Sequence, residues 1–457
     1  MLVMKFGGTS VGTGERIAGV AELVESRLGE EPFVVVSAMG GVTDALLALS
    51  RAAREKDRMA ADTALATIGE KHRAAVDALG LEGEAAVDLR ARIDSELARL
   101  GDLSVGVSLL GELSARTSDS ICAAGEILSA ALTAAALERR GVAVACVDPR
   151  EWMATDATHG AAMPDEAAIS SKASSRLLPE RGAGRVVVTG GFVGAASDGS
   201  TTTLGRGGSD YSAALLGAAL HDAGAAVEAI EIWTDVDGIL TADPRVVPTA
   251  RIVPEVGYAE AAELAFFGAK VLHPATIRPA VARGIPVRVR NTFRPGAPGT
   301  TVRAEVPGAG VMALAMRTGV VALFVGSPRM LLAHGYAARV FAVFEKHSAP
   351  VDVIATSEVS ISITVDARAP IDDLVRDLSV FAEVSVLRDL AVVSVVGRKL
   401  RSTPRVAASV FTALGDINVV LISQGASETN LTFVVQAPDA HEALRRLHRE
   451  LFEKEAA

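Results

Sequence analysis

The stretch Lys5-Phe6-Gly7-Gly8-Thr9-Ser10 follows an apolar strand pattern and leads into a predicted helix, with two glycines at the turn. Similar short apolar runs recur along the chain and alternate with longer helical stretches. The runs lack alternation of apolar and polar residues, as expected of a parallel sheet covered on both faces. The sequence therefore predicts an α/β fold with helices on each side of the sheet. The runs are Val34 to Ser37, Val186 to Thr189 and Ile230 to Thr234, and two helical stretches are Asp210 to Leu220 and Ala259 to Phe267.

The length of 457 residues predicts two to four domains of roughly 150 residues each. The segment from Phe293 to Gly310 is dense in proline and glycine, which helix and strand interiors do not tolerate. We therefore expect a first domain over 1–295 and a linker over 296–312. A charged stretch from Arg51 to Arg99 has few turn residues and is predicted to be a helical insertion without a legible function.

Beyond the linker the chain nearly repeats itself with an offset of 70 residues: Ala337-Ala338-x-Val340-Phe341 recurs as Ala407-Ala408-x-Val410-Phe411, and Ser357-Glu358 recurs as Ser427-Glu428. Such self-similarity indicates two copies of one supersecondary unit. Each copy has the order of a ferredoxin-like βαββαβ module. The predicted modules cover 313–388 and 389–457. Two coincidentally similar helical hairpins are the alternative, but they would not require a constant offset.

The composition excludes several classes of protein. A net charge of −10 argues against a nucleic-acid or anionic-membrane partner, because such binding relies on Lys and Arg. No run reaches the roughly eighteen apolar residues of a membrane-spanning helix, and the first residues do not resemble a signal peptide. Cys122 and Cys146 are far apart, so neither a disulfide framework nor a metal site is expected. A cytoplasmic enzyme fits these observations.

Lys5 and the glycines after it have the outline of a phosphate site. Glycines let backbone N–H groups approach phosphate oxygens, and the ammonium of Lys5 neutralises their charge. Because the lysine precedes the glycines, the motif is not a Walker A loop.

A second motif, Thr203 to Asp210, also lies at a turn before a helix. Arg206 can bind a carboxylate or phosphate through two parallel hydrogen bonds. Asp210 could simply be the N-cap of the helix. Thr234 and Asp235 close a strand further on, and Arg245 and Lys270 supply cations downstream.

Six motifs in this order, together with the repeat, closely resemble the aspartate kinases of the amino-acid kinase family, in which a tandem pair of ACT modules follows the catalytic domain. The resemblance covers essentially the whole chain. The motifs are Lys5 to Ser10, Ser37-Ala38-x-Gly40-Gly41-Val42-Thr43, Gly125-Glu126, Leu204 to Asp210, Trp233-Thr234-Asp235 and Phe267 to Pro274.

The resemblance implies an amino-acid kinase fold and the ATP-dependent phosphorylation of the side-chain carboxylate of L-aspartate, the first step of lysine, threonine and methionine biosynthesis. It also implies that Lys5 bridges the ATP phosphates and that Asp210 organises the reacting centre. Arg206 would hold the α-carboxylate of aspartate and Glu126 its ammonium, with Thr43 and Ser37 in the pocket. Mg²⁺ would bridge the phosphates without a dedicated protein site. The remaining ATP-binding candidates are Gly7, Gly8, Thr234, Asp235, Leu240, Arg245, Lys270 and Val271.

The regulatory half resembles the effector site of lysine-inhibited aspartate kinases, which implies feedback control by L-lysine and a homodimer or higher oligomer through the ACT modules. Asp352 and Glu358 could pair with the ammonium groups of an effector. Ala337 and Pro350 depart from the lysine-type pattern. The candidate effector residues are Met330, Tyr336, Ala337, Val351, Asp352, Ser357 and Glu358.

Two alternatives remain open. A kinase acting on glutamate, acetylglutamate or carbamate would handle phosphate in the same way, although the ACT pair and the motif at Arg206 speak against it. A non-catalytic amino-acid sensor would have no reason to retain Lys5, Arg206, Asp210, Asp235 and Lys270.

Overall fold

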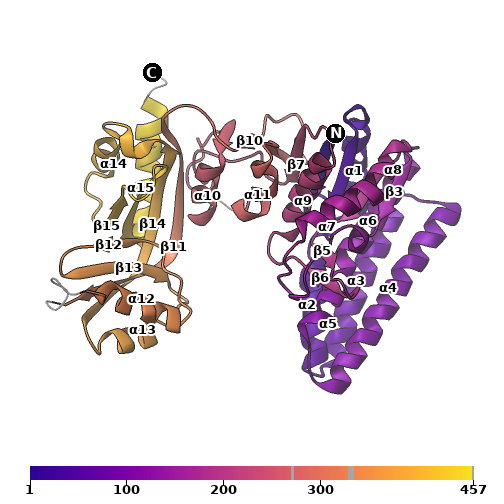
Figure 1. Cartoon of the computed structure of the whole chain (residues 1–457), viewed down its shortest axis with the longest axis horizontal. Coiled ribbons are helices and arrows are strands. Elements are labelled where there is room, and N and C mark those ends of the chain that lie inside the picture. The colour runs from indigo at the N-terminus through magenta and orange to yellow at the C-terminus, as the bar shows by residue number, and fades with distance from the viewer. Residues whose placement is uncertain (269–271, 328–333, 455–457) are drawn as a thin grey trace. The chain divides into compact units, whose positions relative to one another are not determined.

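The computed structural model describes residues 1–268, 272–327 and 334–454. The chain forms two compact units, labelled by element in Figure 1. The first consists of Met1–Gly238 and Leu272–Ala304, and the second of Ile239–Val271 and Glu305–Ala457. The domain limits expected from the sequence, with a first domain over 1–295 and modules over 313–388 and 389–457, remain predictions. The compact units divide the chain differently, because 239–271 belongs to the second unit.

The first unit contains a mostly parallel sheet, in which β1 (Leu2–Phe6) lies between β2 (Pro32–Val36) and β7 (Ala229–Thr234). Its strands follow the order β3-β4-β2-β1-β7-β9-β10. Only the pairing of β10 with β9 is antiparallel among the described pairings of these strands. The predicted α/β class is therefore confirmed. The remaining strands of this unit are β3 (Val144–Val147), β4 (Val186–Gly190), β5 (Val193–Ala195), β6 (Thr201–Thr203), β9 (Val287–Asn291) and β10 (Thr300–Arg303).

The alternation of side chains along β1 decides which way Lys5 points. Leu2, Met4 and Phe6 are buried in a large core that also contains residues of α1, α2, α3 and α6. Since neighbouring residues of a strand face opposite sides of the sheet, Val3 and Lys5 face the other side. Helix α9 covers that side so closely that a Cβ on Gly217 would lie 3.8 Å from Val3 Cγ2. Lys5 therefore points toward α9. The helices of this unit are α1 (Gly14–Glu25), α2 (Val42–Arg54), α3 (Arg58–Ala78), α4 (Gly83–Leu110), α5 (Ala115–Cys122), α6 (Ala124–Arg139), α7 (Glu166–Lys172), α8 (Leu178–Gly182), α9 (Gly208–Asp222) and α11 (Pro274–Ala282).

The stretch predicted as a helical insertion is helical, and it continues beyond Arg99 to the end of α4 at Leu110. Its helices α3 and α4 pack apolar residues such as Ile68 and Ile93 into the same core as the strands. The helical stretch Ala115–Arg139 is long and apolar enough to cross a membrane, but 89% of its most apolar window is buried inside the structure. It is therefore a core element of the first unit.

The second unit is built around a six-stranded sheet with the order β12-β13-β11-β14-β16-β15. Two long strands, β11 (Gly310–Gly326) and β14 (Glu383–Arg398), run antiparallel at its centre (Figure 1). The repeat predicted from the sequence has the predicted order of elements, so the ferredoxin-like class is confirmed. The other elements are β8 (Glu255–Gly257), α10 (Tyr258–Phe266), α12 (Tyr336–Lys346), β12 (Ile354–Thr356), β13 (Ser360–Asp366), α13 (Ile371–Leu378), α14 (Val406–Leu414), β15 (Val419–Gln424), β16 (Asn430–Gln436) and α15 (Ala440–His448).

The two long strands β11 and β14 each run through both modules. The second half of β11, from Val320 onward, pairs with β13, and the second half of β14, from Leu390 onward, pairs with β16. The first half of β14 pairs with the second half of β11, and the first half of β11 pairs with the second half of β14. The second module therefore takes its fourth strand from the first half of β11, whereas the first module is completed by the first half of β14, which lies within 313–388. Gly319, at φ +72°, marks the register shift at which β11 changes modules.

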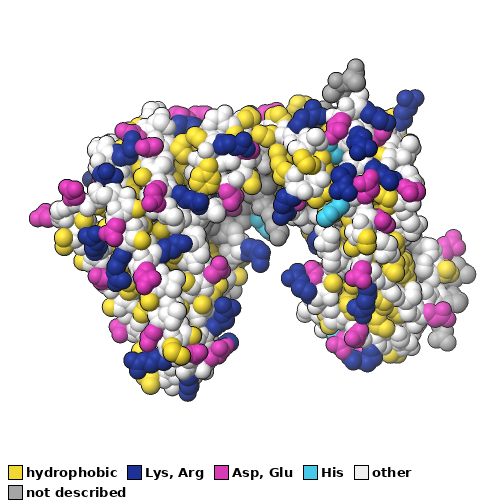
Figure 2. Space-filling model, turned by 180° about the vertical axis from the view of Figure 1, so that it is seen from behind, with side chains coloured by type: hydrophobic (Ala, Val, Ile, Leu, Met, Phe, Trp, Pro, Cys, Tyr) yellow, Lys and Arg dark blue, Asp and Glu magenta, His cyan; other side chains and the backbone are white. Residues whose placement is uncertain are grey.

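Charges of both signs cover the surface. On the face drawn in Figure 2, Lys and Arg side chains are interspersed with Asp and Glu. Among the described residues of this face, cationic and anionic side chains are mixed and are not gathered by sign.

Candidate active site

Lys5 and Asp210 meet at the end of β1. Lys5 is 8% exposed, and its Nζ lies 2.5 Å from Asp210 Oδ1. Asp210 is the third residue of α9, whose cap is Gly207 at φ +73° with no side-chain cap. The interpretation of Asp210 as an N-cap is therefore wrong. The positive end of the α9 dipole and the Lys5 ammonium lie together, which makes this a suitable place for an anion.

The glycine turn after β1 packs closely against its neighbours. Gly7 N–H donates to the carbonyl of Trp233 at 3.0 Å, and Gly40 N–H donates to the carbonyl of Gly8 at 2.9 Å. A Cβ on Gly8 would lie 2.9 Å from the carbonyl oxygen of Ala38, so only glycine lets the turns after β1 and β2 approach this closely. The carboxyl ends of β1, β2 and β7 thus meet at one edge of the sheet. In open α/β sheets, ligands bind at this edge, where the strand order reverses.

Glu126 is a buried carboxylate beside this edge. It lies in the first turn of α6, is 4% exposed, and its Oε2 has no hydrogen-bond partner among the described residues. Burial raises the pKa of the Glu126 carboxyl to about 8, although the N–H of Ala38 and the charge of Lys5 oppose the rise. A buried carboxylate oxygen without a donor is costly unless a cation or a donor reaches it. Glu126 therefore offers an unpaired carboxylate oxygen to the cationic group of a ligand.

The other predicted aspartate-binding residues belong to the same unit. Ser37 follows β2 directly, and Thr43 lies in the first turn of α2. Both are half-buried. Arg206 is exposed, two residues before α9, and within the described part of the chain it has no carboxylate partner. Its guanidinium is therefore free to bind an anion.

The predicted ATP-binding residues are distributed over both compact units. Thr234 ends β7, and Asp235 follows it at the same sheet edge as Gly7 and Gly8. Leu240 and Arg245 belong to the second unit, where Arg245 forms an ion pair with Asp243 at 2.6 Å. Lys270 and Val271 lie outside the described residues.

Asp352 is the most enclosed of the described effector candidates with a charge. It forms an ion pair with Arg317 of β11, and its side chain is 8% exposed. Burial raises the pKa of the Asp352 carboxyl, and Arg317 opposes the rise. The Arg317 guanidinium also lies 5.6 Å from the centre of the Phe266 ring. Asp352 is therefore already paired with a cation.

The remaining effector candidates lie around the first module. Tyr336 is buried at the start of α12, and its hydroxyl has no partner among the described residues. Ser357 accepts a hydrogen bond from the N–H of Ser360 at 3.1 Å. Ala337 and Glu358 are exposed and Val351 is half-buried, whereas Met330 lies outside the described residues.

Sequence reasoning missed Glu231, which is fully buried in β7. Its carboxylate lies 3.1 Å from Arg27 and 3.2 Å from Arg290, and it accepts a hydrogen bond from the indole of Trp233 at 3.0 Å. The carbonyl of Trp233 accepts a hydrogen bond from Gly7 N–H. By holding Trp233 in place, this cluster therefore also stabilises the glycine turn. A charged residue within the apolar run Ile230 to Thr234 was the signal that could have revealed it.

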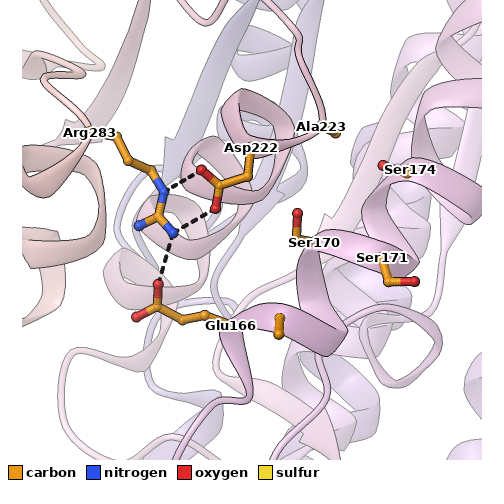
Figure 3. A pocket seen from close by; sticks show the side chains of 8 residues that line it. Glu166, Ser170, Ser171, Ser174, Asp222, Ala223 and Arg283 are labelled. Atoms are coloured by element: carbon orange, nitrogen blue, oxygen red, sulfur yellow. Dashed lines mark hydrogen bonds and ion pairs between the residues drawn. The ribbon is translucent and has the colours of Figure 1, made fainter.

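A separate pocket of about 450 Å³ lies at the opposite end of α9 (Figure 3). Arg283 binds Asp222 at 2.6 Å and Glu166 at 3.1 Å there. Asp222 is twelve residues beyond Asp210 on the same helix, a separation of roughly 18 Å at 1.5 Å per residue. The pocket is therefore not part of the candidate active site.

Comparisons with known proteins agree with this architecture. The model described as the amino acid kinase family matches residues 1–291, and a model described as an ACT domain matches 393–451. The fold and the site at the end of β1 place the chain in the amino acid kinase family.

The similarity to individual relatives covers nearly all of this chain and at least 84% of each relative named here. Lysine-sensitive aspartokinase 3 of Escherichia coli K12 is 38% identical, with 99% of both chains covered. Chloroplastic aspartokinase 2 of Arabidopsis thaliana is 36% identical, with 99% of this chain and 84% of the relative covered. The crystal structure of E. coli aspartokinase III with aspartate and ADP superposes with a TM-score of 0.82 at 37% identity, covering 99% of this chain and 100% of the other. Within its family, the chain belongs to the aspartokinases.

Proposed function

We propose that the chain transfers the γ-phosphoryl group of ATP to the side-chain carboxylate of L-aspartate, giving 4-phospho-L-aspartate and ADP. The observation that carries the proposal is the buried meeting of Lys5 and Asp210 beside the glycine turn, at the sheet edge where the end of α9 also lies. One oxygen of the aspartate side chain attacks the γ-phosphorus as the bond to the β-phosphate oxygen breaks.

The reaction needs positive charge more than it needs a base. An aspartate side chain with a reference pKa near 4 is ionised at neutral pH, so no group has to remove a proton. Two anions must instead approach in line, and preorganised cations lower the cost of that approach. Lys5 and the N-terminus of α9 supply this charge. Asp210 orients the Lys5 ammonium through their ion pair.

ATP would bring Mg²⁺ with it. No cluster of three metal-ligating side chains occurs among the described residues, so the phosphates would supply most of the ligands, as is usual for Mg²⁺. Asp210 is the carboxylate nearest to Lys5 and the candidate protein ligand. When bound, Mg²⁺ would neutralise phosphate charge. Gly7, Gly8, Thr234 and Asp235 would border the nucleotide from the first unit.

Aspartate would be recognised at its two α-substituents. The unpartnered Oε2 of Glu126 would receive the ammonium, and the free guanidinium of Arg206 would bind the α-carboxylate through two hydrogen bonds. Ser37 and Thr43 would line the pocket between them. Glutamate, one methylene longer, would place its side-chain carboxylate out of line with ATP.

We further propose L-lysine as a feedback inhibitor that binds the first ACT module at Asp352. The relative with 38% identity is described as lysine-sensitive, and a related structure, the T-state of E. coli aspartokinase III, contains lysine and aspartate. The enclosed Asp352 carboxylate would pair with an ammonium group of lysine. We also propose that the chain is cytoplasmic and forms a homodimer, or a higher oligomer, through its ACT modules.

An acyl-phosphate assay tests the activity. The product is trapped as a hydroxamate with hydroxylamine after incubation with ATP and either aspartate or glutamate. Lysine, threonine and methionine are then added in turn. Hydroxamate from aspartate with inhibition by lysine is the expected result, whereas product from glutamate alone would overturn the proposed substrate.

A further inference from the structure

Asp119 is a buried carboxylate that the proposed reaction leaves unexplained. It lies in α5 and is 3% exposed. A buried charge is tolerated only when it is well hydrogen-bonded. Asp119 accepts from Thr203 Oγ1 at 2.6 Å, from Gly160 N–H at 3.0 and 3.1 Å, and pairs with His159 Nδ1 at 3.0 Å. Four contacts from two distant segments therefore converge on one side chain.

The segments that Asp119 joins carry the two proposed ligands of aspartate. Helix α5 leads into α6 through Ala123 alone, and α6 presents Glu126 in its first turn. Thr203 is the last residue of β6, three residues before Arg206. The Asp119 to Thr203 hydrogen bond thus links the helix that bears Glu126 to the turn that bears Arg206.

The loop around Gly160 supports that turn from a second side. Ala162 N–H donates to the carbonyl of Thr203 at 2.9 Å. A Cβ on Gly205 would lie 3.3 Å from the carbonyl oxygen of Gly160, and Gly205 has φ +75°. Since Asp119 also binds the N–H of Gly160, it fixes both the strand before the turn and the loop beneath it.

We propose that Asp119 is a positioning residue that sets the separation between Glu126 and Arg206, and so determines how tightly the site binds the α-ammonium and α-carboxylate of aspartate. The inference rests on the proposed function. Asp119 itself does not touch the substrate. Misplacing a binding group by about an ångström is enough to cost up to a hundredfold in rate, so this indirect role has a measurable effect.

The alternative is that Asp119 only stabilises the fold. Both roles predict a lower thermal midpoint when Asp119 is changed, so stability cannot separate them. A positioning role raises the KM for aspartate and leaves the KM for ATP unchanged, because the glycine turn and Lys5 lie on other elements. A purely structural role changes neither KM, or changes both together.

The test uses the full-length chain. Asp119→Asn keeps the shape and one acceptor but removes the charge, and Thr203→Val removes a single hydrogen bond without changing side-chain volume. The control is Asp198→Asn, which removes an exposed carboxylate of the neighbouring β5–β6 turn that lies 3.5 Å from Arg116. We expect Asp119→Asn to raise the KM for aspartate about tenfold and Thr203→Val about threefold, with the KM for ATP and the control within twofold of the parent.

Arg206→Ala, measured in parallel, separates this inference from the proposed function. An unchanged aspartate KM in Arg206→Ala would overturn the proposed binding mode itself. A raised KM in Arg206→Ala with an unchanged KM in both Asp119→Asn and Thr203→Val would overturn only the positioning role. Should Asp119→Asn fail to fold, Thr203→Val decides alone, and a parental aspartate KM in that variant overturns the inference.

Discussion

Aspartate binding should become weaker as the pH falls, because Glu126 must be ionised to receive an ammonium. Burial raises the pKa of Glu126 to about 8 in the ligand-free protein. At pH 7 about nine tenths of the molecules therefore carry a protonated Glu126. Free aspartate keeps its own charges between pH 6 and 8, so the titration belongs to the protein.

The magnitude follows from the ionised fraction, which is about one half at pH 8 and about one hundredth at pH 6. The dissociation constant for aspartate should therefore rise about fiftyfold over this range. Isothermal titration calorimetry in two buffers of different ionisation enthalpy should find close to one proton released per aspartate bound at pH 7. Glu126→Gln should bind more weakly at pH 8 and lose both the proton release and the pH dependence.

The ligand-free protein offers a second measurement of the same group. Because the folded pKa of Glu126 exceeds its ordinary value of 4.5, the native state binds more protons than the unfolded state between these values. The contribution of Glu126 to stability is thus lost as the pH rises from about 4.5 to 8. The thermal midpoint of the parent should fall relative to Glu126→Gln over this range. Proton-free binding with a pH-independent affinity would refute the reasoning.

Three further substitutions test the other parts of the site. Lys5→Ala should lower kcat roughly a hundred- to thousandfold, because it removes a preorganised cation next to the transferring phosphoryl group. A coupled assay of ADP release would measure this loss, and a circular dichroism spectrum equal to that of the parent would show that the variant is folded. Near-parental turnover would contradict this role. Arg206→Ala should raise the aspartate KM roughly ten- to hundredfold at unchanged ATP KM, since a bidentate ion pair with a carboxylate contributes about 1.5–3 kcal/mol; an equal rise in both constants would point to misfolding. Asp352→Ala should raise the lysine concentration for half-inhibition at least tenfold, whereas Asp373→Asn, which removes an exposed carboxylate paired with Arg376, should leave it unchanged. Parental inhibition of Asp352→Ala would exclude Asp352 from the effector site.

The fold of the first unit could be predicted because its signals are local. Apolar runs such as Val186 to Thr189 lie within the strands, and the helix predicted from Asp210 corresponds to α9, which begins two residues earlier. The candidate residues at the sheet edge were predictable because parallel strands bring their carboxyl ends together. Lys5 could be placed for this reason, and its alternation along β1 explains why it meets α9.

Other parts of the site depend on contacts that leave no pattern in the sequence. Asp119 and Thr203 are 84 residues apart, and although Thr203 begins the motif that contains Arg206, Asp119 stands in no recognisable motif. Leu240 and Arg245 are ATP-binding candidates through the resemblance, and no pattern in the sequence indicates that they pack in the second unit. The repeat offset identified both ACT modules but not that the first half of β11 pairs within the second module, because an offset shows which segments are alike and not which segments pair.

The sharing of β11 and β14 between the modules makes the regulatory half a single cooperative body. A chain cut between 388 and 389 would separate the second half of β14 from the first half of β11 but not from β16, and it would leave that edge of the second module open to pairing with other molecules. The two modules are therefore expected to melt in one transition, and the second module cannot be expressed as an independent sensor by truncation at the repeat boundary. A ligand that stiffens one module also stiffens β11 and β14, so its effect reaches the other through continuous backbone.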